Sequence, residues 1–259
     1  MSKIAVLGGT GYLGYYVSKF FDAEPLSRRT GFDITDQEQC YQLQNYDVVI
    51  HMAALIDKSE GQPNEVFRVN AQGTLSVVRT LKKGHILIFT STKEVYDLGD
   101  AYALSKVTAE KYINYYAKHN GFRAGIFRLS TTYAPPTNGS NFVNFFLKSI
   151  QEGTEISLLM EGKQRRDFLY VDDLSRAFER FIDLEASGVY DIGGGGDKST
   201  TILGLIKIIE NVVGKKANLS FSNEPVRGQI HYVTDLSRIS KELDWQPKVS
   251  IAEGIKKIV

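Results

Sequence analysis

A tyrosine and a lysine stand four positions apart in the stretch YALSK, at Tyr102 and Lys106, where the apolar spacing predicts a helix. Side chains four residues apart lie on the same face of a helix, so the phenol and the ammonium group should be neighbours. A tyrosine in water has a pKa of about 10, and a nearby cation favours the phenolate and lowers that pKa. The spacing predicts that Tyr102 gives or takes a proton with the help of Lys106. The alternative is a surface helix on which both side chains are solvated.

Two more polar residues follow the apolar segment Ile86–Thr90. Thr92 lies just past the end of this expected strand and can hydrogen-bond to the same oxygen as Tyr102, which holds that oxygen in place. Glu94 suits a second acid or base, or an ion pair with Lys93. A phenol, a hydroxyl and an ammonium group around one oxygen suit hydride transfer between an alcohol and a ketone.

The N-terminal segment KIAVLGGTGYLGYYVSKFF has the pattern of a strand, a glycine-rich turn and a helix. Ile4–Leu7 is short and apolar, which is typical of a strand buried on both faces. Gly8 permits a tight turn, Gly11 lets the backbone approach a pyrophosphate, and Gly14 lets the helix pack closely on the strand. Because helix N-termini bind anions, this layout predicts a dinucleotide site. The alternative is an ordinary turn between a strand and a helix.

Strand-like and helix-like segments alternate through the first half of the chain. The expected strands are Ile4–Leu7, Glu24–Ser27, Val48–His51, Ile86–Thr90 and Ala124–Arg128, and the expected helices are Glu65–Lys82, Tyr102–His119, Asn141–Gln151 and a last stretch from Ile251. This alternation predicts an α/β fold with a Rossmann-like, doubly wound parallel sheet. The pattern changes after Ala134. We therefore expect a dinucleotide-binding domain over 1–134, to which some later segments return, and a smaller substrate-binding lobe over 135–259.

Composition narrows the class of protein. The 259 residues carry a formal net charge of +1, so no strong field attracts nucleic acid or a membrane surface. No uninterrupted apolar run approaches the length of about 18 residues that a membrane span needs. Cys40 is the single cysteine and cannot form an internal disulfide, which suits a reducing compartment. We expect a cytoplasmic protein that binds neither nucleic acid nor membrane.

Several segments, taken together and in order, resemble the extended short-chain dehydrogenase/reductases that act on nucleotide sugars. They are GGTGYLG (8–14), FDITD (32–36), HMAA (51–54), FTSTKEVY (89–96), YALSK (102–106), FRLSTTYAPP (127–136), QRRDFLYVDD (164–173) and VRGQIHYVTD (226–235). The resemblance implies Thr92, Tyr102 and Lys106 as catalytic residues, with Lys106 also holding the nicotinamide ribose. It implies cofactor contacts from Gly8, Thr10, Gly11, Tyr12, Leu13, Gly14, Ile34, Ala53 and Ala54, with Asp33 at the adenine.

The same resemblance implies substrate contacts. Arg166 and Arg227 match diphosphate contacts of the family, and Thr131 and Asn141 lie in matching substrate segments. Many epimerases and dehydratases have Asn where this chain has Thr131, so the segment is closer to the deoxysugar 4-ketoreductases. Dehydratases place an Asp where this chain has Lys93, a weak proton donor at neutral pH. Dehydration is therefore disfavoured. The loop DLGDA, between Tyr96 and Tyr102, is shorter than in most relatives.

Cofactor choice depends on the end of the second expected strand. NAD-specific relatives end this strand with an acidic residue that binds both ribose hydroxyls. Here Ser27, Arg28 and Arg29 stand there instead. A hydroxyl and guanidinium groups suit a 2′-phosphate, so NADP(H) is favoured and NAD(H) remains an alternative.

These observations predict an NADP-dependent oxidoreductase that reduces a nucleotide-linked 4-keto sugar. The alternatives are a nucleotide-sugar 4-epimerase that retains NAD and, in another class, a non-catalytic NADP-binding regulator. Asp172 and Asp173 are expected to be a helix N-cap and a local hydrogen-bonding group, and no metal site is expected. Gly193–Gly196 is expected to form a flexible turn. The resemblance also implies a homodimer that pairs through the helix Tyr102–His119.

Overall fold

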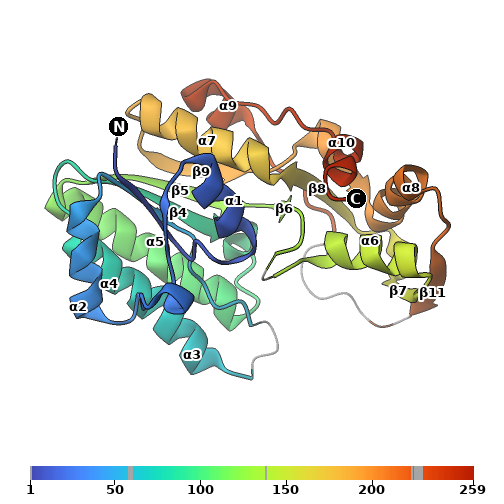
Figure 1. Cartoon of the computed structure of the whole chain (residues 1–259), viewed down its shortest axis with the longest axis horizontal. Coiled ribbons are helices and arrows are strands. Elements are labelled where there is room, and N and C mark those ends of the chain that lie inside the picture. The colour runs from blue at the N-terminus through green and yellow to red at the C-terminus, as the bar shows by residue number, and fades with distance from the viewer. Residues whose placement is uncertain (1, 58–60, 138, 223, 225–229) are drawn as a thin grey trace.

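A computed structural model describes residues 2–57, 61–137, 139–222, 224 and 230–259 (Figure 1). Its main sheet contains six parallel strands. In spatial order they are β2 (Glu24–Leu26), β1 (Ile4–Leu7), β3 (Val48–His51), β4 (Ile86–Thr92), β5 (Arg123–Leu129) and β9 (Gly188–Ile192). The strand order changes direction between β1 and β3. In doubly wound sheets, ligands bind at the carboxyl ends of the strands at this point.

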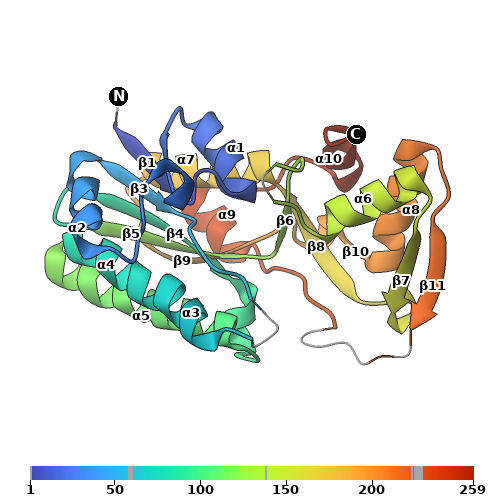
Figure 2. The ribbon, with the colours of Figure 1, turned by 60° about the horizontal axis from the view of Figure 1, so that its bottom comes forward.

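Helices cover both faces of the sheet. Helices α1 (Tyr12–Phe20) and α7 (Val171–Asp183) lie on one face, and α4 (Gly73–Thr80) and α5 (Ala101–Asn120) lie on the other (Figure 2). Strand β3 is buried along its whole length, as a parallel strand between two helical layers must be. The predicted α/β fold with a Rossmann-like, doubly wound parallel sheet is confirmed.

A second lobe follows the carboxyl end of β5. It contains a sheet of β6 (Thr131–Tyr133), β8 (Arg165–Tyr170) and β10 (Ser199–Thr201), and a parallel pair of β7 (Glu155–Leu159) and β11 (Asn218–Ser222). Its helices α6 (Phe142–Glu152), α8 (Ile202–Val213) and α10 (Ile251–Lys256) lie beside these strands (Figure 2). Helix α7 and strand β9 follow β8 in the sequence but belong to the first lobe. Helix α9 (Ser237–Leu243) lies near β9. The division at residue 134 stays a prediction.

Short turns complete the described chain. They are η1 (Arg28–Thr30), α2 (Gln37–Cys40), η2 (Tyr41–Asn45), η4 (Lys93–Tyr96), η5 (Met160–Gly162) and η6 (Gly196–Lys198). The predicted strand ending at Ser27 stops at Leu26, because Ser27 caps η1 through reciprocal contacts with Thr30. Strand β4 continues two residues beyond the prediction, to Thr92.

The stretch predicted as one helix over Glu65–Lys82 has three parts. These are α3 (Pro63–Phe67), a π-helical turn η3 (Arg68–Gln72) and α4. Asn70 in η3 is buried and hydrogen-bonds to both backbone groups of Leu55 and to Ser105 Oγ. Such wide turns often occur at functional sites. The π-turn presents Asn70 to the loop that follows β3.

The prediction of an N-cap at Asp172 or Asp173 is wrong, whereas the predicted local hydrogen-bonding group is found at Asp173, which pairs with Arg176 one turn later. Tyr170, not an aspartate, is the N-cap of α7, and both aspartates lie in its first turn. The carboxylate of Asp173 is buried and accepts hydrogen bonds from the backbone N–H groups of Lys248 and Val249, at 2.8 Å each. It thus anchors the C-terminal segment over a long sequence distance. No group of three or more His, Cys, Asp or Glu side chains that could hold a metal ion occurs among the described residues.

A search of the same described residues finds no helix with the length and apolar character needed to cross a membrane.

Candidate functional site

A cavity of about 540 Å³ lies at the carboxyl ends of β1, β3 and β4. It is lined by every residue predicted to bind the cofactor, namely Gly8, Thr10, Gly11, Tyr12, Leu13, Gly14, Ser27, Arg28, Arg29, Asp33, Ile34, Ala53, Ala54, Tyr102 and Lys106, and by Thr92. The structure therefore brings the glycine-rich turn, the basic stretch and the Tyr/Lys pair into one space. A cavity of this size at the switch point suits a dinucleotide.

Three positions of the glycine-rich turn, Gly8, Gly9 and Gly14, leave no room for a Cβ. Gly8 has a φ of +78°, and a Cβ on it would lie 2.8 Å from the Ala53 backbone. A Cβ on Gly14 would overlap the carbonyl oxygen of Gly8. Gly11 is the N-cap of α1, and no acidic side chain lies in the first turn of this helix. The helix N-terminus therefore points uncompensated N–H groups at the cavity, as a diphosphate requires.

Tyr12 begins α1 and joins this turn to the second lobe. Its hydroxyl lies 2.6 Å from Asn144 Oδ1 on α6 and accepts a hydrogen bond of 2.8 Å from the backbone N–H of Ala134. The Tyr12 ring therefore connects the lobes, and only its backbone is left for a phosphate. The hydroxyl of Thr10 in turn lies 2.8 Å from that of Ser27, which ties the glycine-rich turn to the end of β2.

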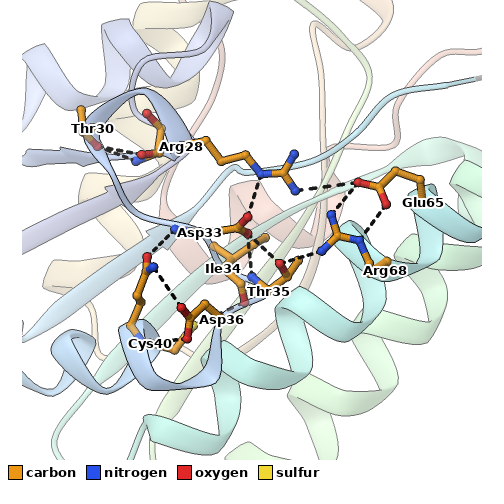
Figure 3. Close-up of polar contacts among 11 residues, drawn as sticks. Arg28, Thr30, Asp33, Ile34, Thr35, Asp36, Cys40, Glu65 and Arg68 are labelled. Atoms are coloured by element: carbon orange, nitrogen blue, oxygen red, sulfur yellow. Dashed lines mark hydrogen bonds and ion pairs between the residues drawn. The ribbon is translucent and has the colours of Figure 1, made fainter.

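Arg28 belongs to a chain of charged and polar contacts at the far end of the cavity (Figure 3). Its Nε donates to Asp33 Oδ2 at 3.0 Å, and its Nη2 lies 3.9 Å from Glu65 Oε1 on α3. Arg68 holds Glu65 through two hydrogen bonds of 2.7 Å and donates to Thr35 Oγ1 at 2.8 Å. The network links the loop after β2 to the helix that follows β3.

Asp33 is occupied within this network. Its Oδ1 accepts from the backbone N–H and the hydroxyl of Thr35, both at 2.9 Å. Burial acts to raise the pKa of this carboxyl, but the Thr35 hydrogen bonds and the Arg28 charge outweigh it, and the pKa is lowered. Arg29 also lines the cavity, and no contact of its guanidinium group with another described residue occurs. Of the two arginines, only Arg28 is compensated by carboxylates.

Thr92, Tyr102 and Lys106 form the other end of the cavity. Thr92 ends β4, and its hydroxyl accepts from the backbone N–H of Glu94 at 3.3 Å. Tyr102 lies in the first turn of α5 and Lys106 one turn later, and they are 8% and 2% exposed. The Lys106 ammonium lies 4.1 Å from the centre of the Phe89 ring.

The expected lowering of the Tyr102 pKa is wrong in direction. Burial raises the pKa of Tyr102, and the charges of Glu94 and Asp100 add to this effect. Burial also lowers the pKa of Lys106 to about 7, against the opposing charge of Glu110. The physical reason is that removal from water disfavours the ionised form of both groups. At neutral pH the protein alone holds a neutral phenol beside an amine that is near its titration point.

His51, which ends β3 and is fully buried, was not among the residues predicted from the sequence. Its Nε2 lies 3.0 Å from Thr74 Oγ1, and burial with the Lys106 charge lowers its pKa to about 3. The segment HMAA contained it, but the prediction used only the two alanines. His51 itself does not line the cavity, but Thr90, Ser91, Ser130 and Thr132 do, and the sequence did not predict them. Thr90 and Ser91 stand beside Thr92 near the end of β4, and Ser130 follows β5, so their signal was the same as for Thr92, whereas Thr132 lies within β6.

The three predicted substrate residues that the structure describes lie outside the lining of this cavity. Asn141 is the N-cap of α6 and accepts from the N–H groups of Val143 and Asn144, so its side chain has a structural task. Thr131 is half-buried in β6. Arg166 on β8 donates to the carbonyl oxygens of Arg165 and Ile230. Arg227 lies outside the described residues.

Glu94 does not line the cavity, but its charge influences the pKa values of Tyr102 in the first lobe and of Arg166 in the second. Its charge contributes to the raised pKa of Tyr102. Burial lowers the pKa of Arg166, and the Glu94 charge opposes this lowering. It therefore lies between the Tyr/Lys pair and the second lobe. Lys93, its neighbour, lies 4.1 Å from the centre of the Tyr232 ring.

Comparison with known proteins agrees with this geometry. The sequence model of the NAD dependent epimerase/dehydratase family matches residues 4–193. A UDP-glucuronate 4-epimerase from Thermodesulfobacterium geofontis is 29% identical over 238 residues, which cover 85% of this chain and 73% of that protein.

Solved structures share the fold along the whole chain. A UDP-glucuronic acid 4-epimerase from Bacillus cereus, in complex with UDP-glucuronic acid and NAD, has a TM-score of 0.85 at 24% identity, covering 99% of this chain and 97% of that one. RMD from Pseudomonas aeruginosa, complexed with NADPH, has a TM-score of 0.87 at 19% identity, covering 100% and 97%. The family match covers most of the chain, and the resemblance drawn from the sequence is confirmed. The chain belongs to the NAD dependent epimerase/dehydratase family, a group of extended short-chain dehydrogenase/reductases that act on nucleotide sugars.

Proposed function

We propose that this protein is a nucleotide-sugar 4-epimerase that retains its nicotinamide dinucleotide. The proposal rests on one observation: Thr92, Tyr102 and Lys106 line the same cavity as the glycine-rich turn. The sequence pattern favours a 4-keto-sugar reductase. The relatives named as UDP-sugar 4-epimerases favour the alternative instead.

The residues fit a dinucleotide cofactor. The Gly8 and Gly14 positions have no room for a side chain, and the N-terminus of α1 faces the cavity, as a diphosphate needs. We assign the diphosphate to the turn Gly8–Gly14 and the nicotinamide ribose to Lys106. When bound, the nicotinamide ring accepts a hydride from the sugar and returns it.

The proposed task of Tyr102 is to take the proton of the C4 hydroxyl as the C4 hydride leaves, and to return it when the hydride comes back to the opposite face. Thr92 holds the same oxygen by a hydrogen bond. Because burial raises the pKa of Tyr102, the phenol needs positive charge nearby to act as a base. Protonated Lys106 supplies one such charge, so we expect activity to need this ammonium. Glu94 is proposed as a second acid or base, and Arg166 and Arg227 as diphosphate contacts of the substrate.

A second candidate is the NADP-dependent reduction of a nucleotide-linked 4-keto sugar. The observation that favours it is the basic rim of Ser27, Arg28 and Arg29, together with an Asp33 carboxylate already bound to Arg28 and Thr35. An occupied carboxylate is a poor ligand for ribose hydroxyls. We therefore propose that NADP(H) binds more tightly than NAD(H), whichever reaction occurs.

One experiment separates the candidates. The purified protein is incubated with UDP-glucuronate or UDP-glucose, and separately with a nucleotide-linked 4-keto-6-deoxy sugar and NADPH, with Tyr102→Phe as the control. An epimerase interconverts two hydroxyl sugars, detected by proton NMR, without net change in absorbance at 340 nm. A reductase consumes NADPH with the keto sugar. Wild-type protein that binds the dinucleotide but shows neither reaction would refute both candidates and favour the non-catalytic regulator. A homodimer and a cytoplasmic location remain predictions, tested by light scattering and by fractionation.

A further inference from the structure

A buried ion pair joins α5 to β5 one helical turn beyond Lys106. Glu110 lies one helical turn after Lys106, and its side chain is 4% exposed. Arg128 on β5 donates to it through two parallel hydrogen bonds, Nη2 to Oε2 at 2.6 Å and Nε to Oε1 at 3.0 Å. Its own side chain is 19% exposed. Bidentate pairs of this kind fix both partners in orientation as well as in distance.

The ion pair also forms hydrogen bonds with residues that precede and follow Thr92 in the sequence. Ser91, the residue before Thr92, donates to Glu110 Oε1 at 2.6 Å. On the other side, Arg128 Nη1 donates to the hydroxyl of Tyr96 at 2.8 Å. Tyr96 ends the turn η4 that follows Thr92 and contains Glu94. The two charges therefore connect the end of β4, the turn after it and the helix that carries Tyr102 and Lys106.

Tyr96 extends the network to a third strand. Its hydroxyl lies 2.8 and 2.9 Å from the two carboxylate oxygens of Asp191 on β9. Stability alone is a weak reason for such an arrangement, since buried ion pairs contribute little more than well-packed apolar side chains of the same volume. Their position between three elements of the candidate active site is the informative feature.

We propose that Glu110 and Arg128, with Ser91, are positioning residues that hold Lys106 and Thr92 in register for the reaction and supply the charge that acts on Lys106. The proposal rests on the proposed function only in that Thr92 and Lys106 are taken as catalytic. None of the three positioning residues was among the predicted site residues.

Among the described residues, few charged or titratable groups face Lys106. Its own helix contributes Tyr102 and Glu110, and β3 contributes His51, which burial keeps neutral. Strand β4 presents the uncharged ring of Phe89. Glu110 is thus the one anion that opposes the effect of burial on the pKa of Lys106 among the described residues. The positive charge of Arg128, which is paired with Glu110, offsets part of the effect of the Glu110 charge on Lys106.

This arrangement predicts opposite effects for its two charges. Glu110→Gln keeps a hydrogen-bonding side chain but leaves the Arg128 cation unbalanced, so the pKa of Lys106 should fall by about one pH unit. Arg128→Met leaves the Glu110 anion unbalanced, so the pKa of Lys106 should rise by about half a pH unit. A merely structural ion pair would weaken the fold in both variants without this reversal of sign.

The measurement is a pH titration of the Lys106 13Cε signal by NMR in the full chain, with the signal assigned from Lys106→Arg. This readout needs no substrate, so a failure of the proposed function leaves it intact. Glu210→Gln is the matched control, because Glu210 likewise accepts hydrogen bonds from a cation and from a second donor, here Lys216 and the backbone N–H of Ala217, but lies on α8 in the second lobe. It should leave the Lys106 titration unchanged. Shifts of the same sign in both test variants, or no shift in either, would overturn the proposal.

Ser91→Ala is a milder variant that keeps both charges and tests the geometry if the charge variants do not fold. Loss of one hydrogen bond should lower kcat by roughly two- to tenfold with KM unchanged, and Ser91→Thr should restore it. An unchanged kcat in Ser91→Ala would refute the positioning role. Equal changes in kcat and KM would refute it as well.

Discussion

Arg28→Ala should change the choice between NADPH and NADH more than any other single substitution in the basic rim. In the structure the Arg28 guanidinium faces the cavity, and its Nε is held by Asp33 at 3.0 Å. The substitution removes one of the proposed contacts to a 2′-phosphate and at the same time releases the Asp33 carboxylate. Both changes act against a 2′-phosphate, and neither acts directly against a ribose hydroxyl.

The magnitude follows from these two effects. A charge-assisted hydrogen bond contributes about 1.5–3 kcal/mol. The Arg28 side chain is 55% exposed, which favours the lower end of that range, or about a tenfold loss of NADPH affinity. The released Asp33 carboxylate, at an assumed distance of about 7 Å in a largely aqueous rim, repels the phosphate by about 1 kcal/mol, or about another fivefold. The combined loss is about 50-fold for NADPH.

Arg29→Ala should cost only about tenfold, because no carboxylate is released with it. Arg28→Lys is the matched control, since an ammonium group keeps the charge opposite Asp33. The assay is a fluorescence titration of NADPH and NADH against wild type and the three variants. The reasoning is refuted if wild type binds NADH more tightly than NADPH, or if Arg28→Ala weakens both cofactors equally.

Four further predictions concern the reaction, the turn, the fold and the substrate. Tyr102→Phe should lower turnover by roughly 10²–10⁴-fold with cofactor binding kept, and near-normal turnover would contradict its role as acid and base. Gly14→Ala should abolish dinucleotide binding in a titration, because the new methyl group overlaps a carbonyl oxygen of the turn, whereas Gly196→Ala meets nothing within 4 Å and should bind normally. The pKa of His51 is about 3 in the folded chain, so the unfolded chain binds the proton first and stability falls as pH drops below about 6.5. Between pH 6.5 and 5 the free energy of unfolding, measured with urea, should therefore fall by about 1.5 kcal/mol less in His51→Asn than in wild type. An unchanged pH dependence would argue against a buried neutral imidazole. Arg166→Ala should raise KM for the nucleotide sugar more than for the cofactor, and an equal rise in both would indicate a folding role.

Local patterns in the sequence determined the fold class, the bounds of several strands and the glycine-rich turn. Strands β1 and β3 begin and end where predicted, because short apolar segments between turn residues can be read without knowledge of their partners. The glycine-rich turn was read from spacing alone, since the backbone there leaves no room for a Cβ at Gly8 or Gly14. Fold class followed from alternation of strands and helices. Even the cap of α6 was visible locally at Asn141, although it was interpreted as a substrate contact.

Only the tertiary structure decided which charges compensate one another. Arg28 meets Glu65 from a different element, and Glu110 meets Arg128 on a neighbouring strand. The pKa of Tyr102 was predicted from its neighbour on the helix, but burial, which depends on the whole fold, determined the direction. Spacing along the chain identifies residues that share a face of one element. Desolvation and contacts between distant segments depend on how all the elements pack, and no short stretch of sequence contains that information.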